Sequence, residues 1–156
     1  MFKLNRLTDY AVVILGQLEA PGRKLRSAQE IGQAAGIPLP TVAKVLNSLG
    51  RAGLVSAQRG AAGGYALERP AERITVADIV EALDGPIALT ACVSGSEAAC
   101  EVQSLCPMSG NWEQVNAAIR AALSAVTLAD MMRPSPAALE ARWGPAPKSR
   151  SHSART

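Results

Sequence analysis

The three cysteines of this 156-residue chain lie close together, in the pattern Cys92-x7-Cys100-x5-Cys106. Thiolates are ligands for zinc, iron–sulfur clusters and copper(I). A structural zinc site typically uses Cys-x2–4-Cys pairs, which this spacing lacks. Wide spacing is easier to reconcile with a cluster, whose iron atoms need ligands farther apart, although three cysteines are one short of the usual four. The spacing alone leaves open an iron–sulfur cluster, zinc and unligated thiols.

A second set of side chains could contact DNA. Thr41, Lys44 and Asn47 lie on the polar face of a predicted helix, where they could reach base edges or phosphates. Arg59 stands among glycines, and arginine is attracted into narrow, A/T-rich minor grooves. The other candidates are Arg51, which could reach the backbone, Ser27, and the glycines Gly60, Gly63 and Gly64, which permit close approach or simply form a turn.

The elements that position these side chains form a predicted helix-turn-helix. Ser27 and Glu30 have the Ser-x-x-Glu spacing of a capping box, and the helix they begin ends at Gly36. Pro40 is suited to the first position of a second helix, which ends at Gly53. This second helix would be the recognition helix. Its apolar face has i, i+3, i+4, i+7 spacing and consists of Val42, Val45, Leu46 and Leu49.

A β-hairpin is expected next. Short β-prone segments at 54–57 and 65–67 flank a glycine-rich turn at 58–64. A hairpin in this place is the wing of a winged helix-turn-helix.

Three further helices are predicted around this unit. The first runs over 8–20 with Thr8 as its cap and Asp9 in its first turn, where a carboxylate complements the helix dipole. Another, capped by Thr75, ends at Gly85. A long helix over 111–131 carries apolar residues at alternating spacings of three and four, which favours a dimer contact over intramolecular packing. These are Trp112, Val115, Ile119, Ala122, Val126 and Ala129.

The predicted fold is therefore mainly α with a small β-hairpin. The winged helix-turn-helix occupies 1–85, a cysteine-bearing loop 86–110, a long C-terminal dimerisation helix 111–132, and a disordered basic tail 133–156. The loop has no periodicity, and loops of this length usually carry function.

Charge and composition narrow the function class. The net charge is only +3, but residues 21–69 hold seven Lys or Arg against two Asp or Glu, so the basic segment coincides with the helix-turn-helix. No segment has the pattern of a signal peptide or a membrane span, so we expect a cytoplasmic protein without structural disulfides. The sole histidine, His152, lies in the tail, and no catalytic constellation is present, so an enzyme is not expected.

The chain resembles the IscR/NsrR/RirA-type family of dimeric winged-helix regulators that sense iron–sulfur status. The resemblance covers residues 2 to about 132. It is strongest to regulators of iron–sulfur assembly (SUF) operons. The matching segments are Leu7-Thr8-Asp9-Tyr10-Ala11, Glu30-Ile31, Leu46 through Leu49, Ala52-Gly53-Leu54-Val55, Arg59-Gly60-x-x-Gly63-Gly64-Tyr65, and the cysteine loop with Cys106-Pro107-Met108 and Trp112.

The resemblance implies that Cys92, Cys100 and Cys106 ligate a two-iron or four-iron cluster. Assembly regulators supply a histidine three residues after the last cysteine, and this chain has Ser109 there. Nitric-oxide sensors use an aspartate of the partner subunit's first helix, and Asp9 stands at the matching position. Glu97, Glu101, Glu113, a small thiol and water are the other candidates for the fourth ligand.

The expected protein is a homodimeric regulator that binds a palindromic operator and represses iron–sulfur assembly or iron homeostasis genes. One alternative is a nitric-oxide- or redox-sensing regulator of the same fold, including one in which the loop is a zinc or thiol switch. The other alternative is an iron–sulfur carrier or redox protein whose winged domain docks proteins.

Overall fold

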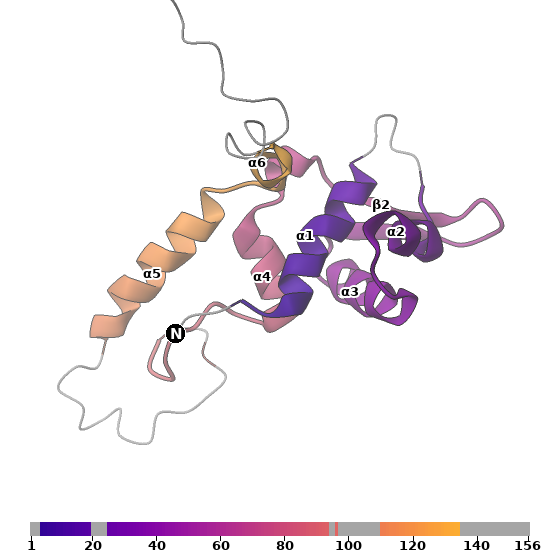
Figure 1. Ribbon diagram of the computed structural model, residues 1–156. Coiled ribbons are helices and arrows are strands. Elements are labelled where there is room, and N and C mark those ends of the chain that lie inside the picture. The colour runs from indigo at the N-terminus through magenta and orange to yellow at the C-terminus, as the bar shows by residue number, and fades with distance from the viewer. Residues whose placement is uncertain (1–3, 20–24, 94–95, 97–109, 135–156) are drawn as a thin grey trace, which may run out of the picture.

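The computed structural model describes residues 4–19, 25–93, 96 and 110–134. In Figure 1 the hairpin and helices α2 and α3 lie at one end, α5 lies at the other, and α1 and α4 lie between them. In chain order the elements are α1 (Arg6–Leu18), α2 (Ala28–Ala35), α3 (Leu39–Arg51), β1 (Val55–Gln58), β2 (Gly64–Leu67), the 3-10 helix η1 (Ala71–Arg73), α4 (Val76–Asp84), α5 (Asn111–Ser124) and α6 (Leu128–Met132).

Helix α1 begins before the predicted cap. Asn5 is the N-cap, and its side chain accepts a hydrogen bond from the Leu7 amide at 3.1 Å. The expectation that Thr8 caps this helix is therefore wrong. Thr8 lies on the same face as the buried Ala11 and Leu15, is itself 2% exposed, and donates its hydroxyl to Asp84 Oδ2 at 2.9 Å.

The predicted helix-turn-helix is confirmed. The capping box between Ser27 and Glu30 is formed, and Gly36 ends α2 in the left-handed conformation, with φ of 67°. Helix α3 begins at Leu39, so Pro40 is its second residue rather than its first. At this position too a backbone N–H would have no partner within the helix, so the proline costs no hydrogen bond. The four apolar residues predicted for the inner face of α3 are all buried.

The hairpin is also confirmed, and it gains a partner that the sequence did not indicate. β1 pairs antiparallel with β2, with Val55 opposite Leu67. The backbones of Arg26 and Tyr65 exchange two hydrogen bonds, of 3.1 and 2.8 Å, so Arg26, which precedes the N-cap of α2, forms an isolated β-bridge with β2. The hairpin is thereby attached to the start of the helix-turn-helix.

Two apolar clusters hold these elements together. The larger one joins α1, α2, α3, the hairpin and α6, and includes Ile79 of α4. The smaller one consists of Val76, Ala77, Val80 and Ile87, against which Ile119 and Leu123 of α5 pack. Helix α4, capped by Thr75 as predicted, contributes to both clusters.

The long helix predicted over 111–131 is divided in the structure. Helix α5 ends at Ser124, and α6 begins at Leu128 after a turn. Val126 O accepts a hydrogen bond from Val76 N at 2.9 Å, and Leu128 N donates to Ile74 O at 2.7 Å. Leu128 is fully buried in the larger cluster. The chain leaves the helical path because these contacts bury Leu128.

A capping box begins α6. Thr127 accepts a hydrogen bond from the Asp130 amide, and Asp130 accepts hydrogen bonds from both the backbone and the hydroxyl of Thr127. The hydroxyl of Thr127 is the main cause that lowers the pKa of Asp130 below its ordinary value. The box therefore favours an ionised Asp130, whose charge complements the start of α6.

We predict that Leu128→Ala lowers the free energy of unfolding by about 2–5 kcal/mol, because truncation of a buried leucine loses apolar burial and leaves a cavity. Denaturant unfolding followed by circular dichroism measures the loss. The control is Met131→Ala on the same short helix, since Met131 is 49% exposed and should change stability much less. Equal effects of the two substitutions would contradict the packing of α6 against the core.

Candidate functional site

The outer face of α3 carries the predicted polar side chains. Lys44, Asn47 and Arg51 are exposed, and Thr41 is half-buried at the edge of this face. Their orientation follows from the inner face, whose four aliphatic residues are buried in the larger cluster. The structure therefore brings together the polar groups that the sequence placed on the recognition helix.

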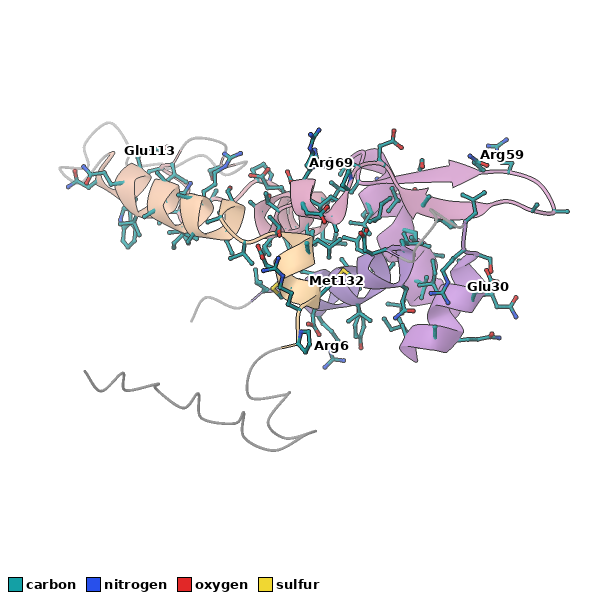
Figure 2. All side chains as sticks on the ribbon, turned by 90° about the horizontal axis from the view of Figure 1, so that it is seen from above. Arg6, Glu30, Arg59, Arg69, Glu113 and Met132 are labelled. Atoms are coloured by element: carbon teal, nitrogen blue, oxygen red, sulfur yellow. The ribbon has the colours of Figure 1, made fainter. Side chains whose placement is uncertain are left out.

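Arg59 lies at the far end of the hairpin, opposite the end of the molecule that carries Glu113 (Figure 2). Among the residues that the structure describes, no ion pair involves Lys44, Arg51 or Arg59. By contrast, Arg120 on α5 pairs with Glu81 at 2.9 Å. Cations without an acidic neighbour are available to phosphates, and these three belong to α3 and the hairpin.

A groove of about 480 Å³ separates α3 from the hairpin. Asn47 and Arg51 of α3 and Ala57 and Tyr65 of the hairpin contribute to its lining. In this groove the amide of Asn47 and the guanidinium of Arg51 lie next to the strands that lead to Arg59. Helix α3 and the hairpin therefore line the same groove.

The wing glycines are required by the local geometry. Gly60 has φ of 116°, a conformation that side-chain-bearing residues rarely adopt. A Cβ on Gly64 would lie 2.8 Å from the carbonyl oxygen of Arg26, and one on Gly63 would collide with the backbone oxygen of Gln58. These glycines shape the turn that carries Arg59, and their direct contact with DNA stays a prediction.

Two groups at the start of α2 are already engaged within the protein. The Ser27 hydroxyl accepts from the Glu30 amide at 3.2 Å and donates to the Glu30 carboxylate at 2.9 Å. The Arg26 guanidinium donates to the backbone and side-chain oxygens of Gln17, each at 2.9 Å. Ser27 therefore has a structural role in capping α2, and its contact with DNA stays a prediction.

The structure places one of the three candidate cysteine ligands. Cys92 is a half-buried free thiol whose Sγ lies 3.2 Å from Thr90 Oγ1, and the next residue, Val93, is buried. Cys100 and Cys106 lie outside the described residues, as do Glu97, Glu101 and Ser109. Within the described part of the chain, no group of three or more His, Cys, Asp or Glu residues is arranged to hold a metal ion.

Asp9, the candidate fourth ligand, is exposed on α1. It lines a pocket of about 660 Å³ together with Leu4, Arg6 and Met131, among others. A second pocket, of about 300 Å³, lies between Leu4, Asn5 and the segment 84–89 that precedes the cysteines. The start of α1 is thus a neighbour of the segment leading to Cys92, and Asp9 is accessible to a ligand or a partner.

Asn116 was not singled out by sequence reasoning. It is 4% exposed, donates from Nδ2 to Ile87 O at 2.9 Å, and accepts at Oδ1 from Leu89 N at 3.1 Å. The available signal was its spacing, because Asn116, Ile119 and Leu123 follow the i, i+3, i+7 pattern of one helix face. That face packs toward α4 in the structure.

Most of the predicted apolar seam faces away from the protein. Trp112 and Val115 are 46% and 45% exposed, and Val126 is exposed as well, whereas Ile119 packs against the smaller cluster. Packing within the described residues therefore leaves Trp112 and Val115, in the first part of this seam, about half exposed. Separately, none of the helices in the described ranges is both long and apolar enough to span a membrane.

Comparison with known proteins agrees with this geometry. The model of the Rrf2 family, described as iron-dependent transcriptional regulators, matches residues 4–134. The chain is 37% identical over 145 residues to the HTH-type transcriptional regulator IscR of Cereibacter sphaeroides, a match that covers 86% of this chain and 92% of that protein.

Solved structures give the same result. CymR, the global cysteine regulator of B. subtilis, superposes with a TM-score of 0.64 at 27% identity over 85% of this chain and 97% of that one. IscR of T. potens superposes with a TM-score of 0.59 at 30% identity over 84% and 86%. The resemblance found in the sequence and its winged-helix fold are thereby confirmed, and the chain belongs to the Rrf2 family, whose members are DNA-binding transcriptional regulators rather than enzymes.

Proposed function

We propose that this protein is a homodimeric repressor of iron–sulfur assembly or iron homeostasis genes and that an iron–sulfur cluster held by Cys92, Cys100 and Cys106 controls its DNA affinity. The observation that carries the DNA-binding part is the group of exposed cations on α3 and the hairpin, Lys44, Arg51 and Arg59, which lack ion-pair partners in the described residues. The cluster rests on the three thiols and on the similarity to proteins named IscR.

In the proposed complex, α3 enters the major groove, because a helix with a polar outer face fits there. Thr41, Lys44 and Asn47 then face the base edges and flanking phosphates. Arg51, at the C-terminal end of α3, faces the backbone, and Arg59 on the hairpin enters the adjacent minor groove. Phosphate contacts by the cations would position the protein, and the polar contacts of α3 would select the sequence.

A homodimer fits the exposed face of α5. Trp112 and Val115 are large apolar residues that the described part of the protein leaves about half exposed. An isologous contact between two copies of α5 would cover both of them and would relate the two recognition helices by twofold symmetry. Such a dimer reads a palindromic site whose half-site spacing is set by the distance between the helices.

The donor chemistry at the cysteine segment suits a cluster. Cys92 is a free, half-buried thiol, and two further thiols follow in the same segment of the sequence. Asp9 is exposed and is available as the fourth ligand from a partner subunit. A cluster held there would supply a group that oxygen, nitric oxide or iron scarcity can damage. In this proposal the chain links the position of Cys92 to α5, because Ile87 in the preceding segment packs with α5.

Arg59→Ala should weaken operator binding at least several-fold. It should also lower the slope of log K against log salt by about one, because the variant lacks one cation near the phosphates. Fluorescence anisotropy with operator DNA at several salt concentrations measures both quantities. The control is Arg120→Ala. Arg120 lies on α5, away from the hairpin, and pairs with Glu81 of α4. An Arg59 variant with unchanged affinity and slope would exclude the proposed wing contact.

Val115→Lys should convert the dimer into a monomer, since a charge would be buried at the centre of the proposed interface. Sedimentation velocity over a range of protein concentrations measures the oligomeric state. Gln114→Lys, at the exposed neighbouring position on α5, is the matched control and should leave the dimer intact. If both variants sediment like the unaltered protein, α5 is not the dimer contact.

Cys92→Ala should lose most of the broad visible absorption, and the iron and sulfide content, that we expect after anaerobic purification. Chemical analysis of iron, sulfide and zinc measures the loss, and Asp9→Ala purified alongside tests the fourth ligand. Normal cluster content in Cys92→Ala would refute this ligand set. A colourless unaltered protein with one zinc would instead support a zinc or thiol switch.

A further inference from the structure

Two polar side chains are buried within the described residues, Thr8 and Asn116. Both are hydrogen-bonded to the same short segment, 84–89, which connects α4 to the cysteines. Thr8 on α1 donates to Asp84 at the end of α4, and Asn116 on α5 binds the backbone of Ile87 and Leu89. The buried polar groups of an otherwise aliphatic interior thus converge on the segment that leads to Cys92.

The carboxamide of Asn116 forms hydrogen bonds to this segment through both its NH2 group and its oxygen. Its amide group donates to Ile87 O at 2.9 Å, and its oxygen accepts from Leu89 N at 3.1 Å. A buried amide is costly unless its donors and acceptors are satisfied, and here the satisfying partners are backbone groups of one segment. An apolar side chain could fill the space but could not fix the segment in this register.

Few residues separate this contact from Cys92, and the residues on either side of them are buried. Ile87 is buried in the smaller apolar cluster beneath α5, and Val93 is buried beyond the cysteine. Between them Thr90 Oγ1 lies 3.2 Å from Cys92 Sγ, and Thr90 O accepts a hydrogen bond from Val93 N. The position of the Cys92 thiol relative to α5 therefore depends on the contact between Asn116 and residues 87–89.

We propose that Asn116 is a positioning residue for Cys92: its two backbone hydrogen bonds hold the segment that leads to the first cysteine of the loop against α5. The proposal rests on the proposed function, because the thiol is positioned for cluster ligation. Thr8 supports the other side of the segment through Asp84. Removal of a group that orients a metal ligand without binding the metal itself typically lowers metal affinity by about 10–100-fold.

The first test needs no cluster. In a Cys100→Ser/Cys106→Ser background, Asn116→Ala should raise the alkylation rate of Cys92 by about tenfold, because the half-buried thiol would no longer be held in place. Amide hydrogen exchange should accelerate at Leu89, which loses its acceptor. The matched control is Gln114→Ala, which removes an exposed amide from the same helix.

The second test uses the full chain after anaerobic reconstitution. Asn116→Ala should release iron to a chelator about 10–100-fold faster than the unaltered protein, and Gln114→Ala should match the unaltered protein. Asn116→Leu fills the space of the carboxamide but offers neither hydrogen bond, so it should release iron about as fast as Asn116→Ala. This variant also keeps the test decisive if Asn116→Ala does not fold.

The outcomes separate positioning from simple stabilisation. A residue that only stabilises the core would lower the midpoint of denaturant unfolding without changing Cys92 alkylation in the folded protein or iron release, and that result would overturn the proposal. If the unaltered protein binds no cluster, the proposed function fails. The rates of Cys92 alkylation and of amide exchange at Leu89 then still test whether Asn116 positions Cys92. Unchanged rates would refute that role.

Discussion

The burial of one face of α3 is the constraint on which the proposed DNA-binding surface depends. Val42, Val45, Leu46 and Leu49 are fully or almost fully buried in the larger cluster, so the helix cannot rotate without exposing them. Because an α-helix has 3.6 residues per turn, this burial leaves Lys44, Asn47 and Arg51 on the opposite side. Leu54 and Val55 enter the same cluster and attach the hairpin to it. The geometry of the outer surface is therefore a consequence of the aliphatic interior.

Elements specified by neighbouring residues could be predicted from the sequence. The capping boxes at Ser27 and Thr75, the apolar spacing of α3 and the glycine-rich hairpin all act within a few residues, and the structure has all of them. Features that depend on distant partners were missed. The role of Thr8 required knowing that it faces Asp84, and the break before α6 required knowing that Leu128 reaches the core, whereas the Asn5 cap of α1 is local and was overlooked. The pairing of Arg26 with Tyr65 and the contact of Asn116 with residues 87–89 are equally long-range.

Helix α4 connects the cysteine segment to the proposed DNA-binding surface. Ile79 lies in the larger cluster with α3, whereas Val76, Ala77 and Val80 form the smaller cluster with Ile87 and α5. Asp84, its last residue, receives the hydrogen bond of Thr8, and Asp78 pairs with Arg69 at 3.0 Å. A movement of the cysteine segment could thus reach α3 through α4, or through α1, which is bonded to Asp84 by Thr8 and shares the larger cluster with α3. Coupling free energies between sites are typically about 1–3 kcal/mol, which is within the range of a few such contacts.

The unequal size of the two clusters indicates where such a movement would be absorbed. The larger cluster buries aliphatic residues from α1, α2, α3, the hairpin and α6, whereas the smaller one buries four residues beneath α5. Regions with few buried apolar contacts open at lower free energy than the main core. A change at Cys92 should therefore shift α5 against α4 and leave the internal geometry of α3 intact. In a dimer that associates through α5, such a shift changes the spacing of the two recognition helices, which is the quantity that a palindromic site measures.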